Sequence, residues 1–170
     1  MVVRKLAPAD VNAFQSLRLL GLRECPAAFA SSYEEECELE LPVVADRLAP
    51  RNDRAVFGAF QEHELIGLVG IKREELRKLS HKAHVWGMYV APANRRRGVG
   101  RQLVAEALCF ALSELHVRQV TLGVNAENRA AIALYACMGF KQFGREPCFM
   151  LVDGFAHDEI QMVCMLRAAA

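Results

Sequence analysis

The stretch Arg95-Arg96-Arg97-Gly98-Val99-Gly100 follows a strand-like run, Val85 to Val90, and opens a segment of helical periodicity from Val99 to Leu115. A helix that begins at a glycine turn points unpaired backbone N–H groups outward, and its aligned peptide dipoles add partial positive charge. Gly98 and Gly100 have no Cβ, so a ligand can approach the backbone closely. The arginines add fixed positive charge and forked donors. The stretch therefore predicts a site for a phosphate or pyrophosphate.

Two common phosphate motifs do not fit this loop. The dinucleotide fingerprint G-x-G-x-x-G/A requires a small residue where this chain has Leu103. A nucleotide P-loop ends in Gly-Lys-Ser/Thr, which does not follow Gly98 here. The pattern R-x-x-G-x-G behind a short strand instead resembles the acyl-CoA pyrophosphate loop of the GNAT N-acetyltransferases. For this segment alone, an arginine-rich surface turn is the alternative interpretation.

A second segment strengthens the resemblance. Gln119 to Asn125 has the pattern of a strand, and Asn128 to Phe140 is similar to the family's N-x-x-A-x-x-L-Y-x-x-x-G-F element. Asn128 is a good helix N-cap, and Gly139 stands where a helix-ending glycine is expected. Because the two motifs occur in the family's order and at a plausible separation, the chain is identified as a member of the GNAT superfamily. The resemblance plausibly covers the whole chain and is best from 84 to 166.

The order of predicted elements gives an α/β fold of the α+β type, with a mixed, mostly antiparallel sheet of about seven strands and helices on both faces. Residues 1–170 are expected to form a single N-acetyltransferase domain. The resemblance further implies that the sheet splays between its fourth and fifth strands to admit the pantetheine arm. Strands are predicted at 2–6, 55–60, 65–72, 83–90, 118–125, 140–152 and 158–166, with helices from 8–10 to Pro26, at 27–40, 99–116 and 128–138, and a short helical turn at 43–48.

Composition narrows the class of protein. The chain has 170 residues, a hydrophobic fraction of 53% and a formal net charge of +1, which favour one globular domain without a general attraction to nucleic acid or membrane. No apolar run approaches the roughly 20 residues of a membrane span, and residues 1–5 do not read as the start of a signal peptide. The cysteines have no metal-ligand spacing, so no metal is expected. We expect a cytoplasmic protein with free thiols, and a homodimer stays open.

The resemblance implies transfer of an acetyl group from acetyl-CoA, as cosubstrate, to a primary amine by direct attack. Backbone groups of the strand before the loop would hold the thioester, the loop would bind the pyrophosphate, and Asn128 would bind the pantetheine arm. Tyr135 is the candidate general acid for the departing thiolate, because a phenol can donate its proton; a core tyrosine is the alternative. The residues expected to bind the cofactor are Met88, Tyr89, Val90, Arg95, Arg96, Arg97, Gly98, Val99, Gly100, Arg101, Asn128 and Tyr135, of which Arg97 could equally be solvated.

The general base is less well defined. Some ribosomal-protein acetyltransferases of the superfamily carry a glutamate on the fifth strand, at the position that is Gly123 here. Histone-acetylating members carry one on the fourth strand, and the matching position here is His84. Since a histidine titrates near neutral pH, His84 is the candidate base; an exposed strand-end histidine is the alternative. Deprotonation through ordered water is a further option, and weaker candidates are Glu34, Glu35 and Glu127.

The acceptor stays open at this stage. The glutamates between Glu34 and Glu40 would favour a cationic amine, although a solvated helix face explains them better. A polyamine, an amino-acid-like metabolite, an aminoglycoside-like compound, and a protein N-terminus or lysine all fit. The competing class of function is a non-catalytic acyl-CoA sensor that keeps the fold, and a nucleotide-binding domain ranks third.

Overall fold

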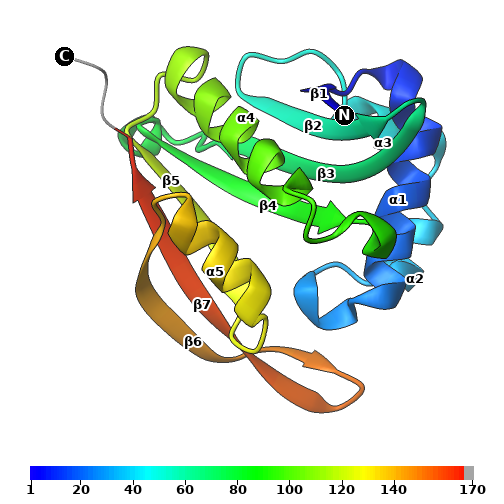
Figure 1. The fold of residues 1–170 in the computed structure, drawn as a ribbon. Helices are drawn as coiled ribbons and strands as arrows, with labels where there is room; N and C mark the ends of the chain where they lie inside the picture. Colours follow the sequence, from blue (N-terminus) through cyan, green and yellow to red (C-terminus); the bar gives the residue numbers. More distant parts are fainter. Residues whose placement is uncertain (167–170) are drawn as a thin grey trace.

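The computed structural model describes residues 1–166 and contains one seven-stranded sheet in the order β1-β2-β3-β4-β5-β7-β6 (Figure 1). Neighbouring strands are antiparallel except β4 and β5, which run parallel. The predicted mixed, mostly antiparallel sheet is therefore confirmed. The strands are β1 (Val2–Lys5), β2 (Arg54–Gln61), β3 (Glu64–Arg73), β4 (Lys82–Val90), β5 (Gln119–Asn125), β6 (Lys141–Val152) and β7 (Phe155–Met165).

Helices cover both faces of the sheet, as the sequence predicts (Figure 1). Successive residues of β3 point to opposite faces. Leu68 packs with Phe14 of α1 in one buried cluster, whereas Val69 packs with Leu103 of α4 in the other. The first cluster lies under α1–α3 and the second under α4 and α5. The helices are α1 (Val11–Glu24), α2 (Tyr33–Cys37), α3 (Leu41–Arg47), α4 (Val99–Ser113) and α5 (Arg129–Cys137).

The prediction of one helical region from Ala27 to Glu40 is wrong. A single 3-10 turn ends at Ala28, an irregular segment follows, and α2 is short. The helix begins at Ser32 because a capping box forms there: the Ser32 hydroxyl accepts from the Glu35 amide at 3.2 Å, and the Glu35 carboxylate accepts from the Ser32 amide at 2.9 Å. Pro42 lies in the first turn of α3, where a missing N–H does no harm.

Two tight hairpins join consecutive strands, β2 to β3 and β6 to β7. Gln61 pairs with Glu64, and Val152 pairs with Phe155. In the second hairpin the φ angles are 50° at Asp153 and 81° at Gly154, and two consecutive left-handed residues are typical of a type I′ turn. This tight turn lets pairing begin at once, so β7 starts earlier than the residue-158 boundary that the sequence predicts.

The sheet opens between its two central strands. β4 and β5 pair from Lys82 with Gln119 to His84 with Thr121, and beyond His84 they separate. On the other side of β4, the register with β3 shifts near Gly87, whose φ angle is 66°. A bulge of this kind inserts an extra residue into one strand and leaves its backbone groups without a ladder partner. The splay that the resemblance implies is thus confirmed, and it lies beside the bulge.

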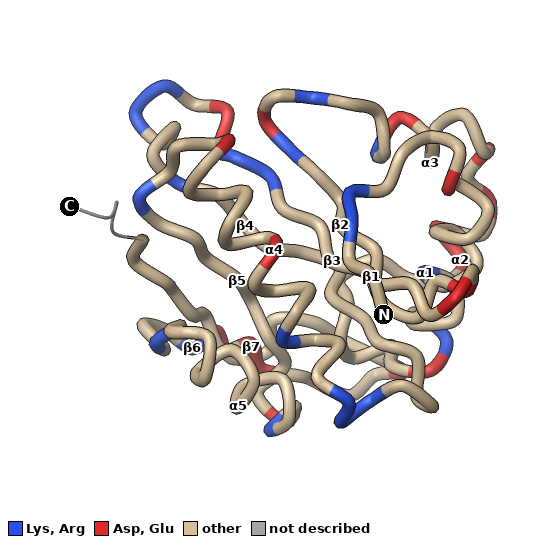
Figure 2. The backbone as a smooth tube through the Cα atoms, turned by 45° about the horizontal axis from the view of Figure 1, so that its top comes forward, with Lys and Arg blue, Asp and Glu red and all other residues tan. Residues whose placement is uncertain are grey.

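The charged residues are distributed unevenly over the fold. Acidic residues gather around α2, beside α1 and α3, whereas arginines follow one another in the loop between β4 and α4 (Figure 2). Among residues 1–166, no helix is long and apolar enough to cross a membrane.

Candidate active site

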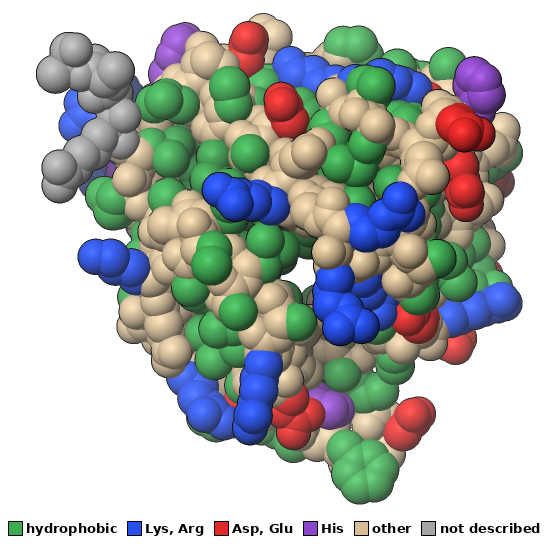
Figure 3. All heavy atoms as spheres, in the orientation of Figure 1, with side chains coloured by type: hydrophobic (Ala, Val, Ile, Leu, Met, Phe, Trp, Pro, Cys, Tyr) green, Lys and Arg blue, Asp and Glu red, His purple; other side chains and the backbone are tan. Residues whose placement is uncertain are grey.

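A cavity of about 760 Å³ occupies the opening between β4 and β5. Its walls are formed by the bulged part of β4, the loop before α4, the first turn of α4, the end of β5 and one side of α5. Figure 3 shows an opening in this face of the molecule, with Lys and Arg side chains on both sides. All the residues that the sequence predicts for the cofactor line this cavity except Arg97, which is exposed outside it.

The loop before α4 has the geometry of an anion cradle. Arg96 and Gly98 have φ angles of 59° and 81°, so the backbone turns sharply and α4 begins directly after Gly98. The first N–H groups of a helix have no partner within the helix. Val99 and Gly100, the first two residues of α4, line the cavity. An added Cβ at Gly100 would lie 3.0 Å from both Leu134 and Met88, so glycine keeps α4 close to its neighbours.

Arg95 is held by protein groups rather than pointing freely into the cavity. Its Nε donates to the Val90 carbonyl at 2.9 Å, and its Nη2 donates to the Glu24 carboxylate at 2.8 Å. The Tyr89 hydroxyl donates to the same carboxylate. Burial, the hydrogen bond to Glu24 and the charge of Glu24 together raise the pKa of Tyr89 well above its usual range. Arg95 and Glu24 therefore tie the loop to the end of α1.

Helix α5 places two of the predicted residues on the cavity wall. The Asn128 side chain accepts from the Ala131 amide at 3.1 Å and so caps α5, and Asn128 also lines the cavity. The Tyr135 ring is buried against Phe140, with ring centroids 5.8 Å apart. Burial raises the pKa of Tyr135 above its ordinary value, which keeps the phenol protonated at neutral pH. Gly139, with a φ angle of 91°, follows the helix as predicted.

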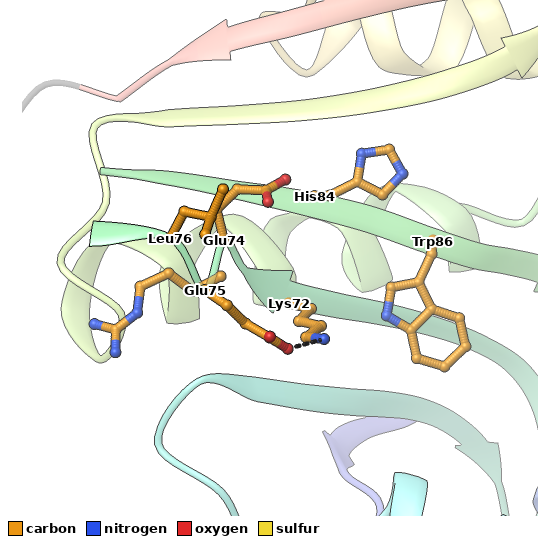
Figure 4. Close-up of a pocket in the computed structure, with 7 residues that line it drawn as sticks. Lys72, Glu74, Glu75, Leu76, His84 and Trp86 are labelled. Atoms are coloured by element: carbon orange, nitrogen blue, oxygen red, sulfur yellow. Dashed lines mark hydrogen bonds and ion pairs between the residues drawn. The ribbon is translucent and has the colours of Figure 1, made fainter. Parts of the chain in front are cut away.

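His84 lies in a separate, smaller cavity of about 410 Å³ on the α1–α3 face (Figure 4). Glu74 and Trp86 line that cavity too, and the His84 Nδ1 lies 3.3 Å from the Thr121 hydroxyl. His84 is exposed to solvent, as the alternative interpretation expects, but desolvation by the residues around it lowers its pKa, and the charge of Glu74 opposes this shift. His84 is the last residue of β4 that pairs with β5, so its side chain lies at the closed end of the opening.

A carboxylate that sequence reasoning missed lies beside Gly123. An added Cβ at Gly123 would overlap the carboxylate of Glu159, which reaches across from β7. The space that a side chain at residue 123 would fill is thus already occupied by a carboxylate. The sequence pattern of β7 indicates this placement. Ile160 and Met162 face the core beneath α4 and α5, so their neighbours along the strand face the opposite side of the sheet.

The glutamates of α2 are not one uniform acidic surface. Glu36 is buried and accepts from Arg18 at 2.9 Å and from Arg47 at 2.8 Å, whereas Glu34, Glu35 and the others are exposed. Burial alone would raise the pKa of Glu36, but its two arginine partners outweigh burial and lower it. Glu36 is thus a structural anion of the α1–α3 layer. Within the described part of the chain, no group of three His, Cys, Asp or Glu side chains is placed to hold a metal ion.

Comparison with known proteins agrees with this geometry. The model of the Acetyltransferase (GNAT) family matches residues 20–140. An uncharacterized protein of Mycobacterium leprae is 34% identical over 158 residues, which are 91% of this chain and 38% of that protein. The N-alpha-acetyltransferase RimI of Mycobacterium tuberculosis is 36% identical over 98 residues, which are 57% of this chain and 58% of RimI. The chain therefore matches less than two thirds of the length of either relative.

A solved structure shows the same fold. An acetyltransferase of Salmonella typhimurium, determined with its cofactor acetyl-CoA, superimposes with a TM-score of 0.82 at 19% identity and covers 100% of this chain and 96% of its own. Because the family model matches most of the sequence, this chain belongs to the GNAT acetyltransferase family.

Proposed function

We propose that this chain is an N-acetyltransferase that moves the acetyl group of acetyl-CoA to a primary amine, with residues 1–170 forming one catalytic domain whose last four residues lie outside the described part. The observation that carries the proposal is the cavity between β4 and β5, which ends at the glycine-rich start of α4 and has Tyr135 and Asn128 on its wall. The cavity is lined both by the arginine-rich loop and by the bulged part of β4, which suits a thioester cosubstrate with a charged end.

The two ends of the cavity differ in chemistry, and each suits one part of acetyl-CoA. At the α4 end, helix N–H groups with Arg96 and Arg101 would bind the pyrophosphate. At the other end, backbone groups of β4 from the bulge to Val90 would hold the thioester carbonyl, where negative charge develops during attack. Arg95 would act indirectly, by fixing the loop through Glu24.

Tyr135 would act as the general acid. When the amine nitrogen attacks the carbonyl carbon, the carbon–sulfur bond breaks and the thiolate requires a proton. The Tyr135 phenol is protonated at neutral pH and can supply this proton as negative charge develops on sulfur, while the burial that raises its pKa also makes it a weaker acid. His84, the base expected from the sequence, lines the smaller cavity beside Glu74, so any part it has in deprotonating the amine would be indirect, through water.

The first acceptor to test is the α-amine of a protein or peptide. The support is the name of the RimI relative, which describes an N-alpha-acetyltransferase. Polyamines, amino-acid amines and aminoglycosides belong in the same panel. The exposed glutamates of α2 would favour a cationic acceptor of any of these kinds.

The experiment has two steps. Thermal unfolding with acetyl-CoA, ATP or NAD tests the cavity: at 100 times Kd a ligand stabilises by about 2.7 kcal/mol, and we expect this for acetyl-CoA alone. Release of free CoA thiol over the amine panel then tests turnover. Equal stabilisation by ATP would contradict the acyl-CoA assignment. Stabilisation by acetyl-CoA with no turnover for any amine would instead favour the sensor.

A further inference from the structure

The strands β5 and β7 bring a glycine and a glutamate together at the opening of the sheet. Gly123 pairs with Gln161, and Asn125 pairs with Glu159, so the Glu159 side chain lies diagonally beside Gly123 on the same face. Any side chain at residue 123 would collide with the Glu159 carboxylate. The absence of a Cβ at residue 123 is therefore what lets a carboxylate from β7 occupy this position.

Gly123 and Glu159 lie near the end of the cavity where the thioester would be held. The last pair between β4 and β5 joins His84 and Thr121, and Gly123 is the next residue of β5 on the same face. On β4 the corresponding residue is Trp86, beside the bulge at Gly87. Both Gly123 and Trp86 line the cavity, so Glu159 stands behind one wall where β4 and β5 have just separated.

The surroundings of Glu159 keep its carboxylate available. Among the described residues, no lysine, arginine or histidine forms an ion pair with it. Glu146 faces it from β6, β5 contributes only uncharged neighbours, and His157 on β7 lies next to Glu127 instead. Burial raises the pKa of Glu159 and the charge of Glu146 adds to the shift, whereas the nearby Gln161 amide, which donates to Glu146 at 3.4 Å, opposes it. A partly buried carboxylate without a cation is a good proton acceptor.

We propose that Glu159 is the general base of this acetyltransferase, supplied from β7 in the space that Gly123 leaves free; the inference rests on the function proposed above. An ammonium acceptor loses two protons overall. Glu159 takes the first, directly or through one water, and the freed nitrogen attacks the carbonyl carbon. The carbon–sulfur bond breaks, Tyr135 gives its proton to sulfur, and Tyr135 recovers a proton from the acetylated nitrogen. The proton on Glu159 leaves to solvent, so one proton is released in each turnover.

The principal test is a set of variants assayed with an amine that the native protein acetylates. Glu159→Gln keeps the shape but cannot accept a proton, and we expect kcat to fall by roughly 10²–10⁴-fold. Glu106→Gln, at an exposed glutamate of α4 that lines neither cavity, is the control and should keep kcat within about threefold. Gly123→Ala leaves the carboxylate in the chain but displaces it, so it should also lower kcat. Binding of acetyl-CoA, measured by calorimetry, should stay native in Glu159→Gln.

A relocation variant separates chemistry from folding. In Gly123→Glu with Glu159→Gly, the carboxylate returns to the same space from β5, and kcat should recover at least tenfold over Glu159→Gln. A measurement that does not depend on turnover is the titration of the Glu159 carboxyl carbon, followed by ¹³C NMR. The Glu159 signal is the one that disappears in Glu159→Gln. We expect the pKa from this titration to lie above the ordinary value of about 4.3.

Two results would overturn the inference. If Glu159→Gln kept the native kcat, the carboxylate would have no part in the reaction. If Glu159 titrated with an ordinary pKa, the partly buried, unpaired environment argued for it would be wrong. Absence of turnover in the native protein would instead end the proposed function, and the base assignment with it. A fall in kcat confined to His84→Ala would assign proton acceptance to His84.

Discussion

The Arg95 guanidinium lies 2.8 Å from the Glu24 carboxylate and joins the loop before α4 to the end of α1. Glu24 also accepts from the Tyr89 hydroxyl, so one carboxylate holds both a strand and a loop that line the cavity. Arg95 is the first residue of the R-x-x-G-x-G pattern, and its bonds indicate that it shapes the loop in addition to carrying charge.

Replacing Arg95 should therefore loosen the loop. We expect Arg95→Ala and Glu24→Gln each to weaken acetyl-CoA binding, because both release the same contact. A double-mutant cycle on acetyl-CoA affinity should give a coupling of about 0.5–3 kcal/mol. Arg97→Ala is the matched control, since Arg97 is exposed outside the cavity and its replacement should change affinity little. Additive effects of Arg95→Ala and Glu24→Gln would show that the contact does not set the loop.

Gly98 offers a test in which strain and ligand approach can be separated. Gly98 and Gly154 both have a φ angle of 81° and open space around an added Cβ, but Gly154 lies in the β6–β7 turn. Valine at either position should destabilise the fold by about 1–2 kcal/mol, because a side chain is strained in this conformation. Thermal unfolding should show similar losses for both variants. Calorimetry should show loss of acetyl-CoA binding for Gly98→Val alone. Equal binding by both variants would contradict an anion-binding role for the loop before α4.

The sequence predicts the parts of this site that depend on local pattern. The glycine turn, the helix it opens and the cap at Asn128 are each encoded within a few neighbouring residues, and the structure has them where expected. The Glu24–Arg95 and Gly123–Glu159 contacts join residues far apart in the chain, and they depend on strand register and helix packing. The predicted helical region from 27 to 40 is wrong for a different, local reason, because the capping box between Ser32 and Glu35 starts a new helix inside it.

Tyr135→Phe removes only a hydroxyl from a ring that stays packed against Phe140. If the phenol protonates the departing thiolate, kcat should fall on the order of 10²-fold while acetyl-CoA affinity stays native. Steady-state kinetics with calorimetry on the same preparation measures both quantities. Unchanged kcat would leave Tyr135 with a packing role alone.

His84→Ala tests the base that the sequence suggests. Its imidazole lies at the closed end of the opening, in the cavity with Glu74, so we expect kcat to fall by less than about tenfold. The lowered pKa of His84 also means that a histidine-dependent rate would rise with pH at or below about 6.5. A pH–rate profile of both proteins with two amines of different pKa distinguishes this rise from titration of the acceptor. Loss of the rise in His84→Ala, with both amines, would favour His84 over Glu159.

Glu159 should carry a stability cost that depends on pH. Because its pKa is raised in the folded protein, ionisation is less favourable there than in the unfolded chain. The native protein is unaffected below the unfolded pKa of about 4.3 and becomes less stable as pH rises through the folded value. Glutamine cannot ionise, so the melting temperature of Glu159→Gln relative to the native protein should increase between pH 4.5 and pH 8. A gain of up to a few degrees is expected, since about 1 kcal/mol moves Tm by roughly 2–4 °C at this size.

Asp10 provides a comparison of opposite sign. Its carboxylate accepts from Arg4 at 2.7 Å, and this hydrogen bond lowers the pKa of Asp10. Its contribution to stability is therefore present above the unfolded pKa and lost as pH falls through the folded value. Asp10→Asn should be less stable than the native protein at pH 7, with a difference that shrinks toward acid. If Glu159→Gln followed the pattern of Asp10→Asn, the fold would stabilise the Glu159 carboxylate. The inference that this carboxylate lies beside Gly123 without a compensating cation would then be wrong.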